Sequence, residues 1–111
     1  MQVRAQALAR RVLCRWPAFS VWGAGRDGKA FLRALPPSVA RRCRALADVD
    51  PRKIGTEYEV EEGGVRVPVI HFSAVVPPVV VCVARGRTGG ALERNVRSVG
   101  LVEGDNCWFF S

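Results

Sequence analysis

Three glycines near the start of the chain have the spacing of a phosphate-binding turn. Gly23, Gly25 and Gly28 form the pattern GxGxxG within the run VWGAGRDGK. In dinucleotide-binding units such glycines build a tight turn between a strand and a helix, and the first N–H groups of that helix face the pyrophosphate. Asp48 lies 20 residues beyond Gly28, where an acidic residue accepts hydrogen bonds from ribose hydroxyls. The candidate cofactor is therefore a nucleotide, either NAD or a UDP-sugar.

A second glycine-rich loop, RGRTGG at residues 85–90, follows an apolar run and contains Thr88 and Gly89. Loops that follow parallel strands gather at the carboxyl edge of the sheet, so we expect both loops to face one crevice. Positive side chains in or beside the two loops would add charge for a phosphate: Arg26, Lys29, Arg85 and Arg87.

The same residues also have purely structural interpretations, which stay open. The glycines are needed merely to make the turn and to let the helix pack closely on the sheet. Asp48 could cap the turn that follows it. Arg52 and Lys53 would tolerate a 2′-phosphate, but surface solvation explains them equally well.

Residue types that support catalysis lack the partners that catalysis needs. His71 is the only histidine, and no serine lies in a nucleophile-elbow pattern. The cysteines, Cys14, Cys43, Cys82 and Cys107, form no CxxC pair and no cluster with histidine, so we expect reduced thiols and no metal site. We assign no catalytic and no metal-ligating residue.

Alternating strand and helix patterns surround these candidates. Helical patterns follow Gly28 and Gly90, and a small hairpin is indicated over residues 58–67. Strand patterns occupy five segments: residues 19–22, 43–48, 67–72, 79–84 and 107–110. The sequence predicts an α/β fold, a small Rossmann-like parallel sheet of about five strands in the order 3-2-1-4-5, flanked by helices.

Positive charge is concentrated at one end of the chain. Residues 1–44 carry a net charge of +9, whereas residues 45–111 carry −2. This asymmetry suits an acidic partner such as nucleic acid, a phosphorylated ligand or an acidic domain, although arginines also solvate helix faces. The candidate nucleic-acid contacts are Arg4, Arg10, Arg11, Arg15, Arg26 and Lys29.

The first 17 residues predict an amphipathic linker helix that leads into a domain at residues 18–111. Residues 2–15 contain no acidic side chain, which is also typical of a mitochondrial transit peptide. We expect a cytoplasmic protein, with a mitochondrial one as the alternative. No apolar run approaches the roughly 20 residues that span a bilayer, so we expect no membrane partner.

Several segments together resemble a known family. They are RWPAFSVWGAGRDGKAFLRAL, ALADVDPRKI, VPVIHFSAVVPPVVVCVARGRTGGALERNVRSVGLVEG and the final FS. Their combination is similar to the carboxyl-terminal region of the β-1,3-N-acetylglucosaminyltransferase-like protein 1 family. That family belongs to the family 2 glycosyltransferases and includes queuosine-tRNA galactosyltransferase. The resemblance covers nearly the whole chain, to Ser111.

The resemblance implies that catalysis takes place outside this chain. In that family an amino-terminal GT-A domain, with a divalent metal, transfers galactose from UDP-galactose to queuosine in tRNA. None of its motifs occurs in these 111 residues. We therefore expect a carboxyl-terminal accessory domain or fragment, which assists tRNA binding or serves as a scaffold for the catalytic domain. The alternative is a small nucleotide-binding module that uses the glycines and Asp48.

Overall fold

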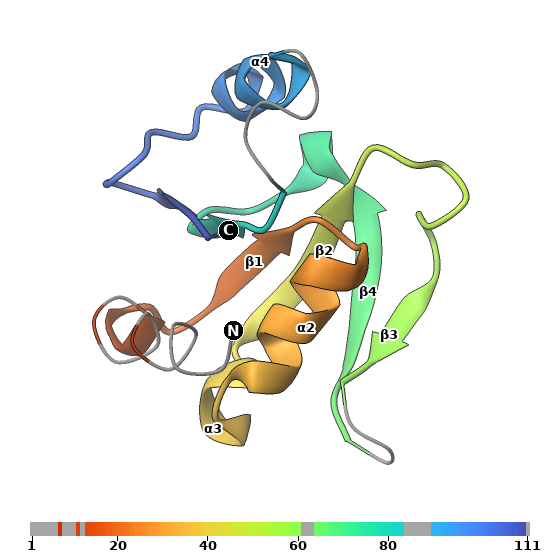
Figure 1. Cartoon of the computed structure of the whole chain (residues 1–111), viewed down its shortest axis with the longest axis vertical. Helices are drawn as coiled ribbons and strands as arrows, with labels where there is room; N and C mark the ends of the chain where they lie inside the picture. The colour runs from red at the N-terminus through yellow and green to blue at the C-terminus, as the bar shows by residue number, and fades with distance from the viewer. Residues whose placement is uncertain (1–6, 8–10, 12, 61–63, 84–89, 111) are drawn as a thin grey trace.

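A six-stranded, mostly parallel sheet runs through the middle of the protein (Figure 1). The computed structural model describes residues 7, 11, 13–60, 64–83 and 90–110, apart from the side chain of Cys14. Across the sheet the strands lie in the order β3-β4-β2-β1-β5-β6. Their bounds are β1 (Phe19–Trp22), β2 (Cys43–Asp48), β3 (Glu57–Glu59), β4 (Arg66–His71), β5 (Val79–Val81) and β6 (Cys107–Phe109).

Two neighbouring strands in the interior of the sheet, β1 and β5, are buried on both faces. Phe19, Val21 and all of Val79–Val81 have no exposed surface. Burial of consecutive residues requires cover above and below the sheet, because successive side chains of a strand point to opposite faces. The uninterrupted apolar sequence of β5 therefore matches its place in the sheet, although β5 ends at Val81 rather than at residue 84.

Helices cover both faces of the sheet. Side chains of the helices and the strands form one core cluster on each face. Phe31 of one helix packs with Phe19 in the first cluster, and Leu92 of another helix packs with Trp22 in the second. The first helix and a short successor thus lie on one face, and the last helix lies on the other. The helices are α2 (Arg26–Ala34), α3 (Pro37–Ala40) and α4 (Ala91–Ser98), with 3-10 helices η1 (Leu13–Arg15) and η2 (Phe72–Ala74).

The sheet has six strands rather than about five, and its order differs from the predicted one by an extra strand at one edge. β3 pairs antiparallel with β4, with Tyr58 opposite Val67, whereas the other paired strands are parallel. The predicted hairpin therefore uses the third parallel strand itself as its second arm. This pairing adds an antiparallel edge strand. With the strands numbered along the chain, their order across the sheet is 3-4-2-1-5-6. Residues 61–63 between the two arms lie outside the described residues.

The segment before β1 packs against the domain. Leu13 is fully buried in the first core cluster, and the Trp16 ring meets the Trp108 ring edge-on with centroids 5.5 Å apart. Of the predicted linker helix, the structure describes Ala7 and Arg11 as helical and η1 as a 3-10 turn, and the rest lies outside the described residues. In the described part of the chain, no helix has the length and apolarity needed to cross a membrane.

Candidate functional site

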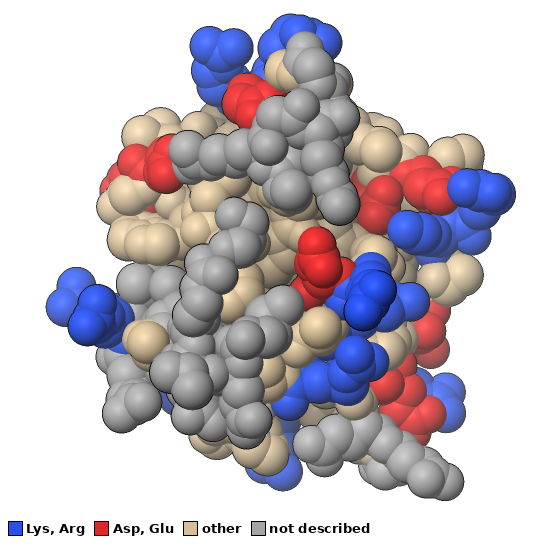
Figure 2. Space-filling model, viewed as in Figure 1, with Lys and Arg blue, Asp and Glu red and all other residues tan. Residues whose placement is uncertain are grey.

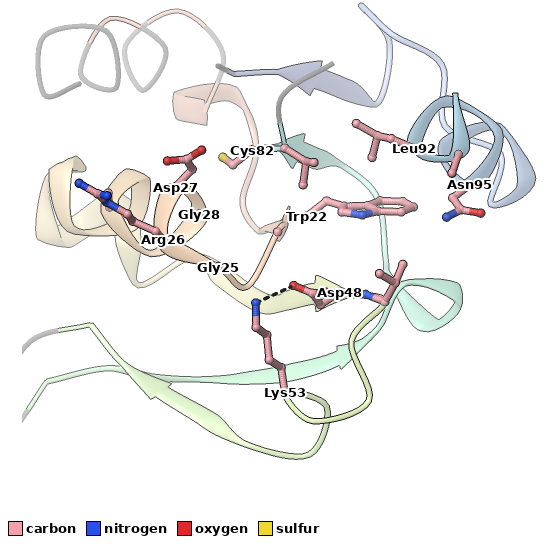
Figure 3. Close-up of a pocket in the computed structure, with 15 residues that line it drawn as sticks. Trp22, Gly25, Arg26, Asp27, Gly28, Asp48, Lys53, Cys82, Leu92 and Asn95 are labelled. Atoms are coloured by element: carbon pink, nitrogen blue, oxygen red, sulfur yellow. Dashed lines mark hydrogen bonds and ion pairs between the residues drawn. The ribbon is translucent and has the colours of Figure 1, made fainter. Parts of the chain in front are cut away.

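A cleft of about 720 Å³ opens at the carboxyl ends of β1 and β2. It lies between the start of α2, the residues that follow β2 and β5, and the first turns of α4. β1 pairs with β2 on one side and with β5 on the other, so the sheet order reverses here. Open α/β sheets bind their ligands at such a switch point. We call this space the switch-point cleft (Figure 3).

Two of the three glycines in the loop at residues 23–28, the glycine loop, are required by the fold. Gly23 has φ +119°, a backbone conformation that side chains disfavour, and a Cβ there would approach the Cys82 carbonyl oxygen to 3.2 Å. A Cβ on Gly28 would overlap the carbonyl oxygen of Gly23. The tight turn and the close packing of α2 on β1 therefore explain Gly23 and Gly28.

Gly25 has no such structural explanation. Its φ of −88° and ψ of −161° suit any residue, and a Cβ would meet only the Lys53 ammonium, at 3.6 Å. Gly25 is also the N-cap of α2, and its missing side chain leaves the backbone open at the helix start, where N–H groups have no partner within the helix. A phosphate could approach this backbone closely, which is the role of the second glycine in such loops.

Asp48 ties the glycine loop to the end of β2. Its Oδ2 accepts a hydrogen bond from the Ala24 N–H at 2.9 Å, and its Oδ1 accepts from the N–H groups of Val49 and Asp50 at 2.7 and 3.0 Å. The side chain is only 14 % exposed. Three backbone donors thus occupy three of the roughly four acceptor positions of the Asp48 carboxylate.

The opposite wall of the cleft is mostly apolar. Trp22 lies between Asp48 and α4, and its ring stacks on Phe72 with centroids 5.1 Å apart. Leu92 and Asn95 extend from α4 toward this wall, so an apolar surface and one amide are available to a flat ring or a sugar (Figure 3).

Cys82 also lines the cleft, and its surroundings disfavour the thiolate form. Burial raises the pKa of the Cys82 thiol, and the negative charge of Asp27 raises it further. The thiol therefore stays protonated at neutral pH, whereas a reactive cysteine needs its thiolate.

His71 has a structural environment at the end of β4. His71 is the N-cap of η2: its Nδ1 accepts a hydrogen bond from the Ser73 N–H at 3.2 Å and lies 2.7 Å from Ser73 Oγ. Within the described ranges no three His, Cys, Asp or Glu side chains gather in a group that could hold a metal ion.

The structure brings together only some of the predicted site residues. Gly23, Gly25, Gly28 and Asp48 meet at the switch-point cleft, which Arg26 also lines. Thr88 and Gly89 lie outside the described residues, as do Arg4 and Arg10. Arg11 and Arg15 precede β1 at the amino ends of the parallel strands, whereas Arg26 and Lys29 belong to the first turns of α2 at the carboxyl ends.

Lysines and arginines accordingly form several separate groups on the face shown in Figure 2. The sequence did not predict that Lys53 lines the cleft whereas its neighbour Arg52 does not, and it did not predict Asn95 at the cleft. No local signal was available for either, because the turn after β2 and the docking of α4 decide which side chains face the cleft.

No protein-family model matches the chain, and no solved structure matches it significantly.

Proposed function

We propose that the chain is a Rossmann-like, nucleotide-binding domain that serves as an accessory domain of a family 2 glycosyltransferase. The five parallel strands, the glycine loop and the switch-point cleft support the nucleotide-binding part of this proposal. The resemblance of the sequence segments to the glycosyltransferase family supports the accessory role. In this proposal the domain binds a ligand and carries out no chemistry.

Gly25 is the observation that carries the nucleotide-binding function. The backbone conformation of Gly25 suits other residues, and a Cβ there would have room. Glycine at such a position keeps the start of the helix open, as expected where a ligand approaches the backbone. The size of the cleft, about 720 Å³, also lies within the range of small-molecule sites, roughly 300–1,000 Å³.

The experiment that tests this function compares the wild type with Gly25→Val in a thermal-shift screen of NAD, UDP, UDP-galactose and ADP. A ligand at ten times its dissociation constant should add about 1.4 kcal/mol to the stability of the wild type. In Gly25→Val the new side chain fills the space beside the Lys53 ammonium, so the ligand shift should disappear. The loss of a favoured N-cap residue should lower the unliganded melting temperature by no more than about 4–8 °C. Absence of any shift in the wild type at millimolar ligand would refute nucleotide binding.

tRNA binding is a second candidate function, and a row of cations on α2 favours it. Arg26, Lys29 and Arg33 recur at helical spacing, and basic side chains lie over α2 in Figure 2. The Lys29 ammonium lies 5.2 Å from the centre of the Tyr58 ring, and the Arg33 guanidinium donates to the Tyr58 hydroxyl at 3.1 Å. Cations held beside an aromatic ring suit contacts with the phosphates and bases of RNA.

Mobility shifts with tRNA at low salt test this second function. Reversal of charge at Arg26 and Arg33 should weaken binding at least tenfold, because fewer phosphates are neutralised and fewer counterions are released. The dependence of the affinity on salt should decrease as well. Reversal at Arg11 and Arg15 is the matched comparison, because these residues lie at the other end of the strands. Equal binding by both double variants and the wild type would refute a role for either group.

A further inference from the structure

Among the described residues, two cations line the switch-point cleft, Lys53 and Arg26. Lys53 extends from the turn after β2 toward the glycine loop (Figure 3), and its Nζ lies 3.9 Å from Asp48 Oδ2. The same ammonium lies 3.6 Å from the point that a Cβ of Gly25 would occupy. Its neighbour Arg52 is paired with Asp50 at 3.1 Å and has a side chain that is 89 % exposed. The turn therefore brings one of two adjacent cations to the cleft and turns the other to solvent.

The Lys53 ammonium keeps its donors for a ligand. At 3.9 Å its contact with Asp48 is an ion pair too long for a hydrogen bond, and no other described residue accepts one from it. Its N–H donors are therefore available to a ligand in a half-exposed position beside the open backbone of Gly25. In Figure 3 the side chain of Arg26 extends along α2 away from Lys53, and Asp27 lies beside Cys82 beyond the glycine loop. Among the described cations, Lys53 is thus the one whose charged group is directed toward Gly25.

Asp48 has the opposite character. Its two oxygens already accept hydrogen bonds from three backbone N–H groups, and its remaining acceptor position faces Lys53. A carboxylate accepts about four hydrogen bonds in total. A ribose diol needs two acceptor positions and would have to displace a backbone donor, which would then be left without its acceptor.

We propose that Lys53 makes the cleft selective for ligands that carry a phosphate, and that Asp48 positions Lys53 and the glycine loop instead of binding ribose. This inference rests on the nucleotide-binding function proposed above. The ligand class is a nucleoside phosphate or its sugar or dinucleotide ester. Its phosphate contacts both the Lys53 ammonium and the backbone of Gly25 at the start of α2, and its ribose makes no essential contact with Asp48.

Titration calorimetry on the wild type, Lys53→Met and Arg52→Met tests the inference. The probes are UDP and ADP, the nucleosides uridine and adenosine, the 2′-deoxy diphosphates, and inorganic pyrophosphate as a competitor. Methionine keeps the length and apolar stem of lysine but removes its charge. Because Lys53 is half-exposed, its replacement should leave the urea midpoint unchanged, and this is measured for both variants.

The wild type should bind at least one diphosphate tenfold or more tightly than the matching nucleoside, and pyrophosphate should compete. Lys53→Met should lose tenfold or more in affinity for that diphosphate, whereas Arg52→Met should stay within twofold of the wild type. The 2′-deoxy diphosphate should bind within threefold of the ribose form, a result that a ribose-binding Asp48 does not allow.

The inference and the function beneath it fail in different ways. If Lys53→Met binds the diphosphate like the wild type, or if removal of the 2′-hydroxyl weakens binding tenfold, nucleotide binding stands and the roles given to Lys53 and Asp48 are wrong. If no probe binds to the wild type at millimolar concentration, both are wrong.

Discussion

The α-carbon of Gly28 lies so close to the carbonyl oxygen of Gly23 that no side chain fits between them. This contact joins the end of β1 to the first turn of α2 and sets the position of the helix on the sheet. It also separates the glycines that the fold requires from Gly25, which it does not. The consequences for stability and for binding are therefore expected at different positions.

Alanine at Gly28 should destabilise the protein by more than alanine at Gly25. Gly28→Ala forces the helix away from the strand, and overpacking of this kind costs about 2–3 kcal/mol. Gly25→Ala places a Cβ in ordinary contact with Lys53 at 3.6 Å and replaces a favoured N-cap residue, so the free energy of unfolding should fall by less than about 1 kcal/mol. Urea denaturation followed by circular dichroism measures both. Equal midpoints for the two variants would contradict the division between them.

Loss of the Asp48 carboxylate should loosen the glycine loop. Asp48→Ala leaves the N–H groups of Ala24, Val49 and Asp50 without their acceptor, and we expect a loss of about 2 kcal/mol in the free energy of unfolding. Arg52→Ala is the control, because its pair with Asp50 is exposed and its removal should leave the urea midpoint unchanged. Hydrogen exchange at the Ala24 N–H should become faster in the Asp48 variant alone.

The buried Cys43 thiol predicts a loss of stability at high pH. Burial raises the pKa of Cys43 to about 12. In the unfolded chain a thiol has a pKa of about 8.5, so above that pH the unfolded state releases a proton that the folded state retains. Stability should therefore fall as the pH rises from about 9 toward 12, by about 1–2 kcal/mol at pH 10. Cys43→Ala should show a smaller fall, and an identical pH dependence in both proteins would contradict this cause.

Leu13 should contribute to the stability of the domain although it precedes the sheet. Leu13→Ala empties a fully buried position in the first core cluster, and such changes cost about 3 kcal/mol. Arg15→Ala, at an exposed position of the same 3-10 turn, should cost almost nothing. If Leu13→Ala has the midpoint of the wild type, the segment before β1 is a detachable linker.

Patterns of buried apolar residues predicted the central part of the fold well. The strand at Cys43–Asp48 has the predicted bounds, and the helix after the glycine loop lies where Phe31, Leu32 and Leu35 recur at helical spacing. Because the rest of the domain covers these elements, the spacing of their apolar residues matches the faces that are buried, and it therefore predicts them. β3 was harder to place, because an edge strand with exposed Glu57 and Glu59 buries little and its partner is set by tertiary pairing.

The candidate site was predictable in its location but not in the roles of its residues. GxGxxG marks a turn whether or not a ligand binds, and only the space around each glycine distinguishes Gly25 from Gly23 and Gly28. Asp48 follows its strand at the expected distance, yet its hydrogen bonds go to backbone groups 24 residues earlier and directly after it. The local sequence predicts neither the contacts of the Asp48 carboxylate nor the direction of the Lys53 side chain, because both depend on the conformation of the turns in the folded protein.

The hydrogen bond from Ala24 to Asp48 has a consequence for the speed and the strength of ligand capture. It holds the glycine loop in its final shape in the unliganded protein, at the junction of two buried strands. For the nucleotide binding proposed above, a ligand would therefore meet a glycine loop that is already in place and would not have to order it, a step that costs binding free energy in flexible sites. Association should be limited by diffusion into the cleft, and differences in affinity among ligands should arise from their rates of departure.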